Sequence, residues 1–267
     1  MITVNTNMVS TWAAYNLNNT NTNLQRSLSR LSSGSRINSS YDDAGGLAVS
    51  MKLSAAIRRT EATQSNVNNA ISLLQTQDGV LKSADKVLVR MAELAALATD
   101  VTKSTNDLAL YQSELDSLKT QLGSLIAEEF NGVSLFGGTS ATGGALGTNG
   151  SLTVVTSEDG GQSVAISQLN LAYLSDSSGV GTAITTAGAG GIHISTNALA
   201  TASVSTLNTA IQNLATLRAT NGSQQVRLTF AADMLAINRN NLEAANSRIM
   251  DVDVAAESAN LAKQNIL

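Results

Sequence analysis

The 267-residue chain contains no cysteine and no proline, and aromatic residues make up only 3 % of it. Without cysteine, the chain has no disulfides, no thiolate metal ligands and no cysteine nucleophile. Because one proline inside a helix costs about 3 kcal/mol, the lack of proline favours long, uninterrupted helices. The scarcity of aromatic side chains argues against the compact core of a typical enzyme. These absences together favour an extended helical protein.

Charge is also scarce and evenly spread. Charged residues make up 13 % of the chain, the net charge is -4, and lysines and arginines are scattered rather than clustered. We therefore expect no nucleic-acid partner. The chain has no run of about 18 apolar residues, so we expect no transmembrane helix. The N-terminus lacks the basic and apolar segments of a Sec-type signal peptide, so export would need another route.

The N-terminal segment carries one narrow apolar stripe. Leu17, Leu24 and Leu31 recur at intervals of seven, and Leu28 fills the intermediate position. This spacing is typical of a coiled-coil seam. Because a single helix of this kind is only marginally stable in water, we expect these leucines to pack against another helix.

Two further helices are predicted after an interruption at residues 34–46. Asp42 or Asp43 is the expected N-cap of a helix from Ala44 to about Asp100, whose apolar residues again recur at sevens. Ser104 and Asp107 form a predicted capping pair that opens the next helix. That helix is expected to end near Phe130, before an Asn-Gly turn at 131–132.

The composition changes between residues 137 and about 201, where Gly, Ser, Thr and Ala dominate. Alternating apolar residues predict short strands at 152–156 and 163–167, and a third strand is possible at 191–195. Helical periodicity returns with Leu207 and continues at sevens through Ala256, with a possible bend at Asn221-Gly222. The pattern predicts a mainly α fold: an elongated antiparallel coiled-coil or helical-bundle rod with a small β-hairpin-rich outgrowth from the middle of the chain.

Four stretches closely resemble bacterial flagellin. They are LSSGSRINSSYDDAGG at 31–46, NVNNAISLLQTQDGVL at 66–81, EEFNGVSLFGG at 128–138 and NNLEAANSRIMDVDVAAE at 240–257. They occur in the order and at the separation that the family has, and the match covers roughly residues 1–136 and 205–267. The middle of the chain is short, so the resemblance is to a short form without large outer domains.

The resemblance implies a structural subunit that polymerises into the flagellar filament for swimming motility, with no cofactor and no catalysis. It implies secretion through the flagellar type III export apparatus with the help of an export chaperone, and an extracellular location in the flagellum. Besides other copies of itself, the implied partners are hook-associated and cap proteins. In this interpretation the four leucines of the first helix form a seam between subunits.

The family's organisation also implies how the chain divides. Residues 1–43 correspond to the N-terminal core helix and connector, 44–136 to the N-terminal rod helices, and 137–204 to a β segment. Residues 205–250 correspond to the C-terminal rod helix, and 251–267 to the start of a C-terminal core helix. The connector residues in this interpretation are Gly34, Arg36, Asp42, Asp43, Gly45 and Gly46.

Flagellins continue past the position of Leu267 with another apolar helical stretch, which this sequence lacks. We therefore expect the seam leucines to lack most of their partner within the chain, and a protein ending there to polymerise poorly.

Responsive flagellins are also recognised by a Toll-like innate receptor. The matching residues here are Arg90, Leu94 and Glu114, although Val89 stands where the family often has Gln.

Two alternatives belong to other functional classes. Hook–filament junction proteins share the N-terminal pattern, but they tend to have proline just after the paired aspartates, where this chain has Ala44-Gly45-Gly46. An enzyme would need a convergent acid–base cluster, and the chain has one histidine, His193, without metal ligands at suitable spacing. Asp42 and Asp43 fit a helix cap better than a carboxylate pair. The sequence therefore favours a filament subunit.

Overall fold

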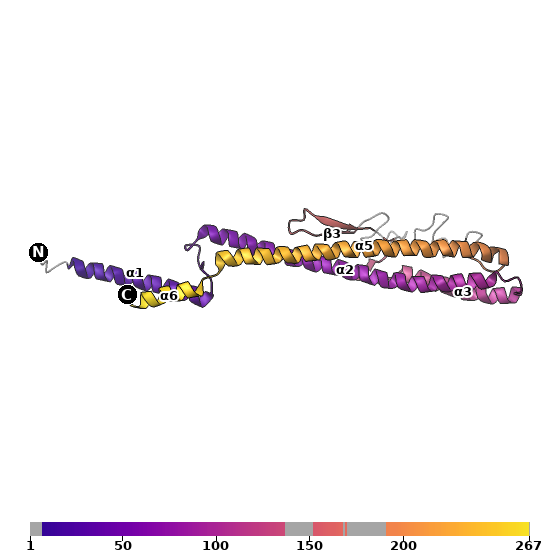
Figure 1. Ribbon diagram of the computed structural model, residues 1–267, viewed down its shortest axis with the longest axis horizontal. Coiled ribbons are helices and arrows are strands. Elements are labelled where there is room, and N and C mark those ends of the chain that lie inside the picture. Colours follow the sequence, from indigo (N-terminus) through magenta and orange to yellow (C-terminus); the bar gives the residue numbers. More distant parts are fainter. Residues whose placement is uncertain (1–6, 137–151, 168, 170–190, 267) are drawn as a thin grey trace. The chain divides into compact units, whose positions relative to one another are not determined.

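The computed structural model describes residues 7–136, 152–167, 169 and 191–266, most of which are helical (Figure 1). The chain divides into two compact units: unit 1 comprises Met1–Ala62 and Ala236–Leu267, and unit 2 comprises Thr63–Leu235. The helices are α1 (Met8–Ser33), α2 (Ala44–Ala98), α3 (Thr105–Ile126), α5 (Asn197–Met250) and α6 (Val254–Ile266). The mainly α fold expected from the sequence is confirmed. Within the described ranges, no helix is long and apolar enough to cross a membrane.

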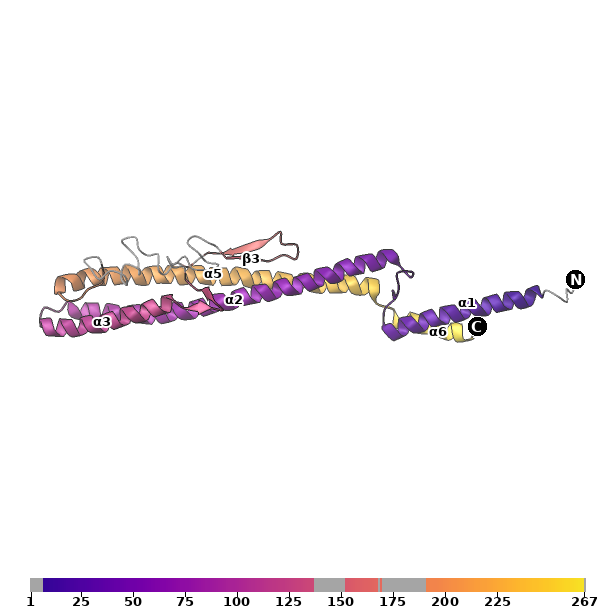
Figure 2. The ribbon, with the colours of Figure 1, turned by 180° about the vertical axis from the view of Figure 1, so that it is seen from behind.

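Unit 2 is a helical bundle built on the predicted leucine seams. α3 runs back along α2, and α5 lies beside them (Figures 1 and 2). Each fully buried leucine side chain contributes about 1.5–3 kcal/mol of burial free energy. The seam leucines that are buried in this core are Leu74, Leu81, Leu88, Leu108, Leu115, Leu122, Leu207, Leu214, Leu228 and Leu235.

The start of α3 agrees with the sequence, but its end does not. Ser104 accepts a hydrogen bond from the backbone N–H of Asp107, whose carboxylate accepts one from the backbone of Ser104, so the predicted capping box is confirmed. The helix ends at Ile126 rather than near Phe130, because the chain turns into a two-stranded hairpin. Its strands are β1 (Glu129–Phe130) and β2 (Val133–Ser134). Asn131 and Gly132 between them have φ values of 52° and 75°, as a type I′ turn requires.

A second hairpin comes from the middle of the chain. Strands β3 (Leu152–Val155) and β4 (Ser163–Ile166) pair antiparallel, which confirms the first two predicted strands. The third expected strand, 191–195, is wrong: this stretch is irregular and buries Ile192 and Ile194 in the core of unit 2. The rest of the expected β segment, 137–151 and 170–190, lies outside the described residues.

α5 begins and continues differently from the sequence expectation. It starts at Asn197, before the periodic leucines, and the Thr196 hydroxyl accepts a hydrogen bond from the N–H of Leu199. The expected bend at Asn221-Gly222 is absent, because α5 runs unbroken through it. Asn221 is fully buried and donates to the carbonyl of Leu74 on α2, so this polar side chain holds two helices together instead of interrupting one.

Unit 1 contains α1 and α6, together with the first turns of α2 and the last turns of α5. α1 and α6 pack side by side and run in opposite directions (Figures 1 and 2). The sequence predicted one helix continuing from Leu207 through Ala256, and this is wrong. The chain breaks between Met250 and Val254, and the Asp253 carboxylate restarts the helix by accepting hydrogen bonds from the N–H groups of Ala255 and Ala256.

Candidate functional site: the terminal helices and their connector

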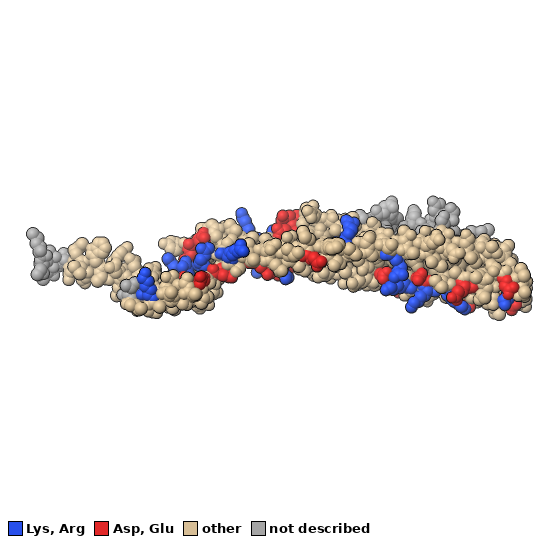
Figure 3. All heavy atoms as spheres, viewed as in Figure 1, with Lys and Arg blue, Asp and Glu red and all other residues tan. Residues whose placement is uncertain are grey.

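α1 has large apolar side chains that nothing in the described part of the chain covers. Met8, Trp12, Tyr15 and Leu17 are all more than 60 % exposed, and Ser27 is the only described residue of α1 that is buried. The first turns of α1 extend past the end of α6 and carry no charged side chain (Figures 2 and 3). Large exposed apolar side chains on an uncharged helix surface are typical of protein–protein interaction sites.

The predicted leucine seam of α1 is only partly covered. Leu24 and Leu31 are half-buried in the part of the chain where α6 packs against α1, whereas Leu17 is 61 % and Leu28 50 % exposed. The hydroxyls of Thr20 and Thr22 donate hydrogen bonds to backbone carbonyls of their own helix, so these polar groups need no second helix. α1 therefore keeps an incomplete apolar face within one chain.

The segments that enter and leave the terminal helices are joined to each other. Ser35 and Asp251 form an antiparallel bridge, and the N–H of Val252 donates to the carbonyl of Gly34. Gly34 ends α1 with φ 70°, a left-handed conformation that favours glycine. These bonds hold the start of α6 beside the end of α1.

Arg36 fastens the same connector to the end of α5. Its backbone N–H donates to the carbonyl of Met250, and its Nε and Nη2 donate to the carbonyl of Ile249 at 3.3 and 2.9 Å. A guanidinium at the C-terminal carbonyls of a helix satisfies free acceptors and opposes the negative end of the helix dipole. The sequence placed Arg36 in the connector but gave no sign of this contact.

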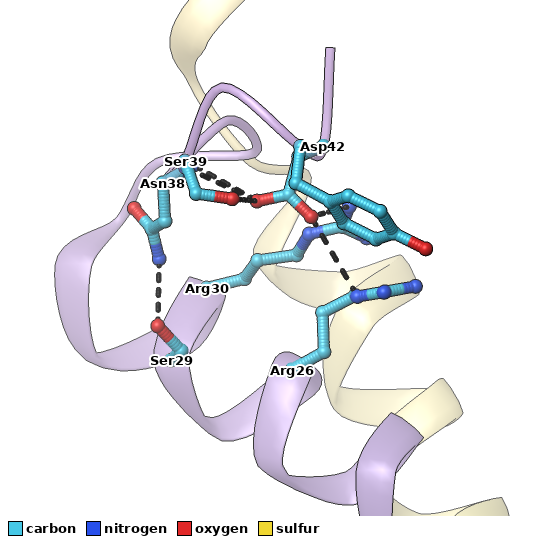
Figure 4. Close-up of a pocket in the computed structure, with 7 residues that line it drawn as sticks. Arg26, Ser29, Arg30, Asn38, Ser39 and Asp42 are labelled. Atoms are coloured by element: carbon cyan, nitrogen blue, oxygen red, sulfur yellow. Dashed lines mark hydrogen bonds and ion pairs between the residues drawn. The ribbon is translucent and has the colours of Figure 1, made fainter. Parts of the chain in front are cut away.

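The paired aspartates have separate tasks. Asp43 is the N-cap of α2, since its carboxylate accepts a hydrogen bond of 2.8 Å from the N–H of Gly46. Asp42 folds the loop before it by accepting from the N–H groups of Asn38 and Ser39 and from the Ser39 hydroxyl (Figure 4). Burial alone would raise the pKa of Asp42, but these hydrogen bonds and the nearby Arg30 charge outweigh it and lower that pKa.

The two connector glycines differ in how closely they are packed. A Cβ on Gly46 would come within 2.5 Å of the Asp43 carboxylate and 2.8 Å of the buried Ile37 side chain. A Cβ on Gly45 would make only an ordinary contact of 3.6 Å. A side chain at position 46 would therefore force Asp43 and Ile37 to shift, while one at position 45 would not.

The residues matched to receptor recognition lie in unit 2. Arg90 on α2 forms ion pairs with Glu114 on α3 at 2.8 Å and with Glu93 at 3.1 Å, and these bonds raise the pKa of Arg90. Leu94, by contrast, is fully buried in the core. The structure brings Arg90 and Glu114 together on the surface and places Leu94 beneath it.

Sequence reasoning did not single out a second apolar surface, on α5. Val226, Phe230 and Met234 follow each other at intervals of four, and each is more than half exposed. Their spacing of four places them on one side of the helix, but the buried leucines of α5 dominate the apolar periodicity of this segment, so the sequence does not set the exposed residues apart. Within the described residues, no group of three acidic, histidine or cysteine side chains could hold a metal ion.

Comparison with known proteins agrees with this architecture. The family model for the bacterial flagellin N-terminal helical region matches residues 4–141, and that for the C-terminal helical region matches residues 204–267. Flagellin FlaB2 of Treponema pallidum is 32 % identical over 266 residues, which cover 99 % of this chain and 91 % of the relative. Flagellin of Bacillus subtilis is 31 % identical over 283 residues, which cover 99 % and 92 %.

Two solved structures are similar as well. Bacillus cereus flagellin matches with a TM-score of 0.54 and 28 % identity, over 64 % of this chain and 88 % of that one. A putative flagellar hook-associated protein from Vibrio parahaemolyticus matches with a TM-score of 0.65 over 79 % of this chain and 100 % of that one, but at 16 % identity it shows the shared fold alone. With both helical regions matched and relatives aligned over nearly its whole length, the chain belongs to the bacterial flagellin family.

Proposed function

We propose that this chain is the structural subunit of a bacterial flagellar filament and that α1, together with α6, joins it to other copies. Flagellins are structural proteins, and the curated relatives include filament core proteins of Treponema. The observation that carries the assembly role is the uncovered face of α1, with Trp12 64 % and Leu17 61 % exposed.

Burial of this face supplies the driving force for assembly. Most helical stability in proteins comes from packing of an apolar face, and little of the surface of α1 is packed within one chain. Covering its exposed aromatic and leucine side chains by neighbouring copies would contribute about 25 cal/mol for each Å² of apolar surface removed from water. A filament that grows without closing requires heterologous contacts, in which this face of one copy meets a different face of the next.

The connector supports this arrangement by fixing where the terminal helices begin. The Ser35–Asp251 bridge and the Arg36 bonds to Ile249 keep the entry to α6 beside the exit from α1. The two terminal helices therefore leave the connector as a pair. A subunit that presents a paired surface loses less conformational entropy on assembly than one with two independent tails.

The assembly role is tested with two substitutions of the same kind. Leu17→Asn changes an exposed leucine of α1, and Leu110→Asn changes one that is 72 % exposed on α3 in unit 2. We expect Leu17→Asn to reduce the mass of filament sedimented from purified protein and Leu110→Asn to leave it near that of the unchanged chain. Normal filaments from Leu17→Asn in electron microscopy would contradict the proposal.

Export and accessory partners follow from the same proposal. The flagellar type III apparatus and a dedicated chaperone would deliver the subunit, which would add to the filament between hook-associated and cap proteins outside the cell. The test is to express the chain in a flagellated host with and without a working export apparatus. Appearance of the protein in the medium in both cases would contradict this route.

Recognition by a Toll-like receptor is a second proposal, favoured by the Arg90–Glu114 pair on the surface of unit 2. Leu94 would act by supporting the helix beneath the contact, since its side chain is buried. We expect Arg90→Asp to lower the response of receptor reporter cells and Arg58→Asp, a change of another exposed arginine, to leave it unchanged. Equal responses to both variants would contradict the assignment.

A further inference from the structure

A polar hollow lies where the last turns of α1 face the connector (Figure 4). Its volume is about 330 Å³, which is room for a side-chain head group and solvent. The residues that line it are Arg26, Ser29, Arg30, Asn38, Ser39, Tyr41 and Asp42. All of them belong to unit 1.

The hollow carries more positive than negative charge. Two arginines, Arg26 and Arg30, face one carboxylate, that of Asp42. The carboxylate Oδ1 lies 3.6 Å from Arg26 Nε and 3.9 Å from Arg30 Nη2, whereas a charge-assisted hydrogen bond is about 2.7–2.9 Å long. The other oxygen, Oδ2, already accepts from Asn38 and Ser39.

Hydrogen-bond donors are left over in this hollow. Arg30 Nε has no hydrogen-bond partner among the described residues, but it is shielded from solvent, so an incoming group would meet the partly exposed guanidinium groups of Arg26 and Arg30 instead. Ser29 Oγ accepts from Asn38 Nδ2 at 2.9 Å, so its own O–H is available to donate. A guanidinium presents its donors as a fork that fits the two oxygens of a carboxylate. Unused donors beside an excess of positive charge fit an oxyanion.

We propose that this hollow binds a carboxylate supplied by an Asp or Glu side chain of a second copy of the chain, an inference that rests on the proposed filament function. Charge complementarity selects this occupant. The chain has 20 acidic and 16 basic residues and a net charge of -4, so copies tend to repel each other, and a net-positive hollow beside α1 is a place where one copy attracts another. A buried carboxylate–arginine contact also fixes the register between two surfaces more sharply than apolar packing does.

The first test uses the full-length monomer and two small probes, acetate and inorganic phosphate. Side-chain Nε–H signals of Arg26 and Arg30 are followed by NMR as each probe is added. We expect saturable shifts with acetate in the unchanged chain and loss of saturation in Arg26→Gln. Shifts with phosphate alone, or no saturable shift with either anion, would overturn the proposal.

The second test compares filament assembly of two variants. Arg26→Gln removes one guanidinium from the hollow, and Arg58→Gln removes an exposed one from α2. We expect the critical concentration for assembly to rise about tenfold for Arg26→Gln and to change less than about twofold for Arg58→Gln, since a charge-assisted bond to arginine is roughly twice as strong as a neutral one.

The two tests separate this proposal from the filament function. If the unchanged chain forms no filaments, the filament function fails, and the acetate titration alone decides whether the hollow is a carboxylate site. If filaments form and acetate binds, but Arg26→Gln and Arg58→Gln assemble alike, the second copy is not the source of the carboxylate and the proposal is overturned. The proposal is supported if Arg26→Gln alone raises the critical concentration about tenfold and acetate binding is saturable.

Discussion

α1 and α3 are built from similar leucine seams, yet one is exposed and the other is buried. Leu17 of α1 is 61 % exposed, whereas Leu115 of α3 is fully buried among α2 and α5. The helices differ in what lies beside them, since unit 2 supplies a complete set of partners, whereas in unit 1 α6 and the connector cover only part of α1. A heptad repeat therefore shows that a helix needs a partner, but not whether that partner belongs to the same chain.

Truncating one leucine in each helix should show the largest difference between them. We expect Leu115→Ala to lower the free energy of unfolding by about 2–5 kcal/mol, because it leaves a cavity in a packed core. Leu17→Ala should lower it by less than about 0.5 kcal/mol, as is usual for exposed positions. Urea unfolding of the monomer measures both. A loss at Leu17 as large as that at Leu115 would show that α1 is packed in the monomer.

Two helical glycines provide a second pair. Gly46→Ala should destabilise the first turns of α2 by about 1–3 kcal/mol, because the new Cβ pushes against Asp43 and Ile37. Gly79→Ala has open space around it and should stabilise α2 by about 0.5–1 kcal/mol through helix propensity. Amide hydrogen exchange along α2 reports both changes. A stabilising Gly46→Ala would mean that the connector is loosely packed.

The helix caps give a smaller contrast. Ser104→Ala removes the capping box of α3 and should cost unit 2 about 1 kcal/mol in the free energy of unfolding. Asn7→Ala removes the side chain that accepts from Val9 and Ser10 at the start of α1, and we expect it to fray that end without moving the unfolding midpoint of unit 2. Circular dichroism during thermal unfolding distinguishes them. Equal midpoints for both variants would contradict the contrast.

Acid titration is the mildest perturbation. The Ser104 hydroxyl and backbone N–H lower the pKa of Asp107, and the loop around Asn38 and Ser39 lowers that of Asp42 against the effect of burial. The ordinary pKa of an aspartate is 3.8. Each carboxylate therefore contributes stability that is fully present above pH 3.8 and is lost as the pH falls through its lower pKa in the folded chain. Carboxyl-carbon NMR shifts should give midpoints below 3.8 for both groups. A midpoint at or above 3.8 for Asp42 would contradict its role in the connector.

Local signals in the sequence predicted much of this fold. The Ser104–Asp107 pair, the Asn-Gly turn at 131–132 and the start of α2 at Ala44 depend on residues within three or four positions of each other, so the sequence alone shows them. The leucine repeats likewise predicted which residues fill the core of unit 2. The end of α3 was predicted too late, because a two-residue strand leaves no periodic signal.

Contacts between distant segments were not predictable in the same way. Arg36 and Ile249 are separated by 213 positions, and only the folded connector brings them together. The break before Val254 follows from that meeting, because the backbone of Asp251 pairs with Ser35 instead of continuing the helix. Asn221 resembled a helix breaker, and only the position of the Leu74 carbonyl explains why it stabilises the helix pair.

We propose that α1, which is left incomplete in one chain, is completed by other copies. Amide hydrogen exchange of the monomer and of assembled filaments, followed peptide by peptide, tests this claim. We predict fast exchange for α1 in the monomer and slow exchange in the filament, with slow exchange for the core segments of α2, α3 and α5 in both. Equal protection of α1 in the monomer and in the filament would contradict the claim.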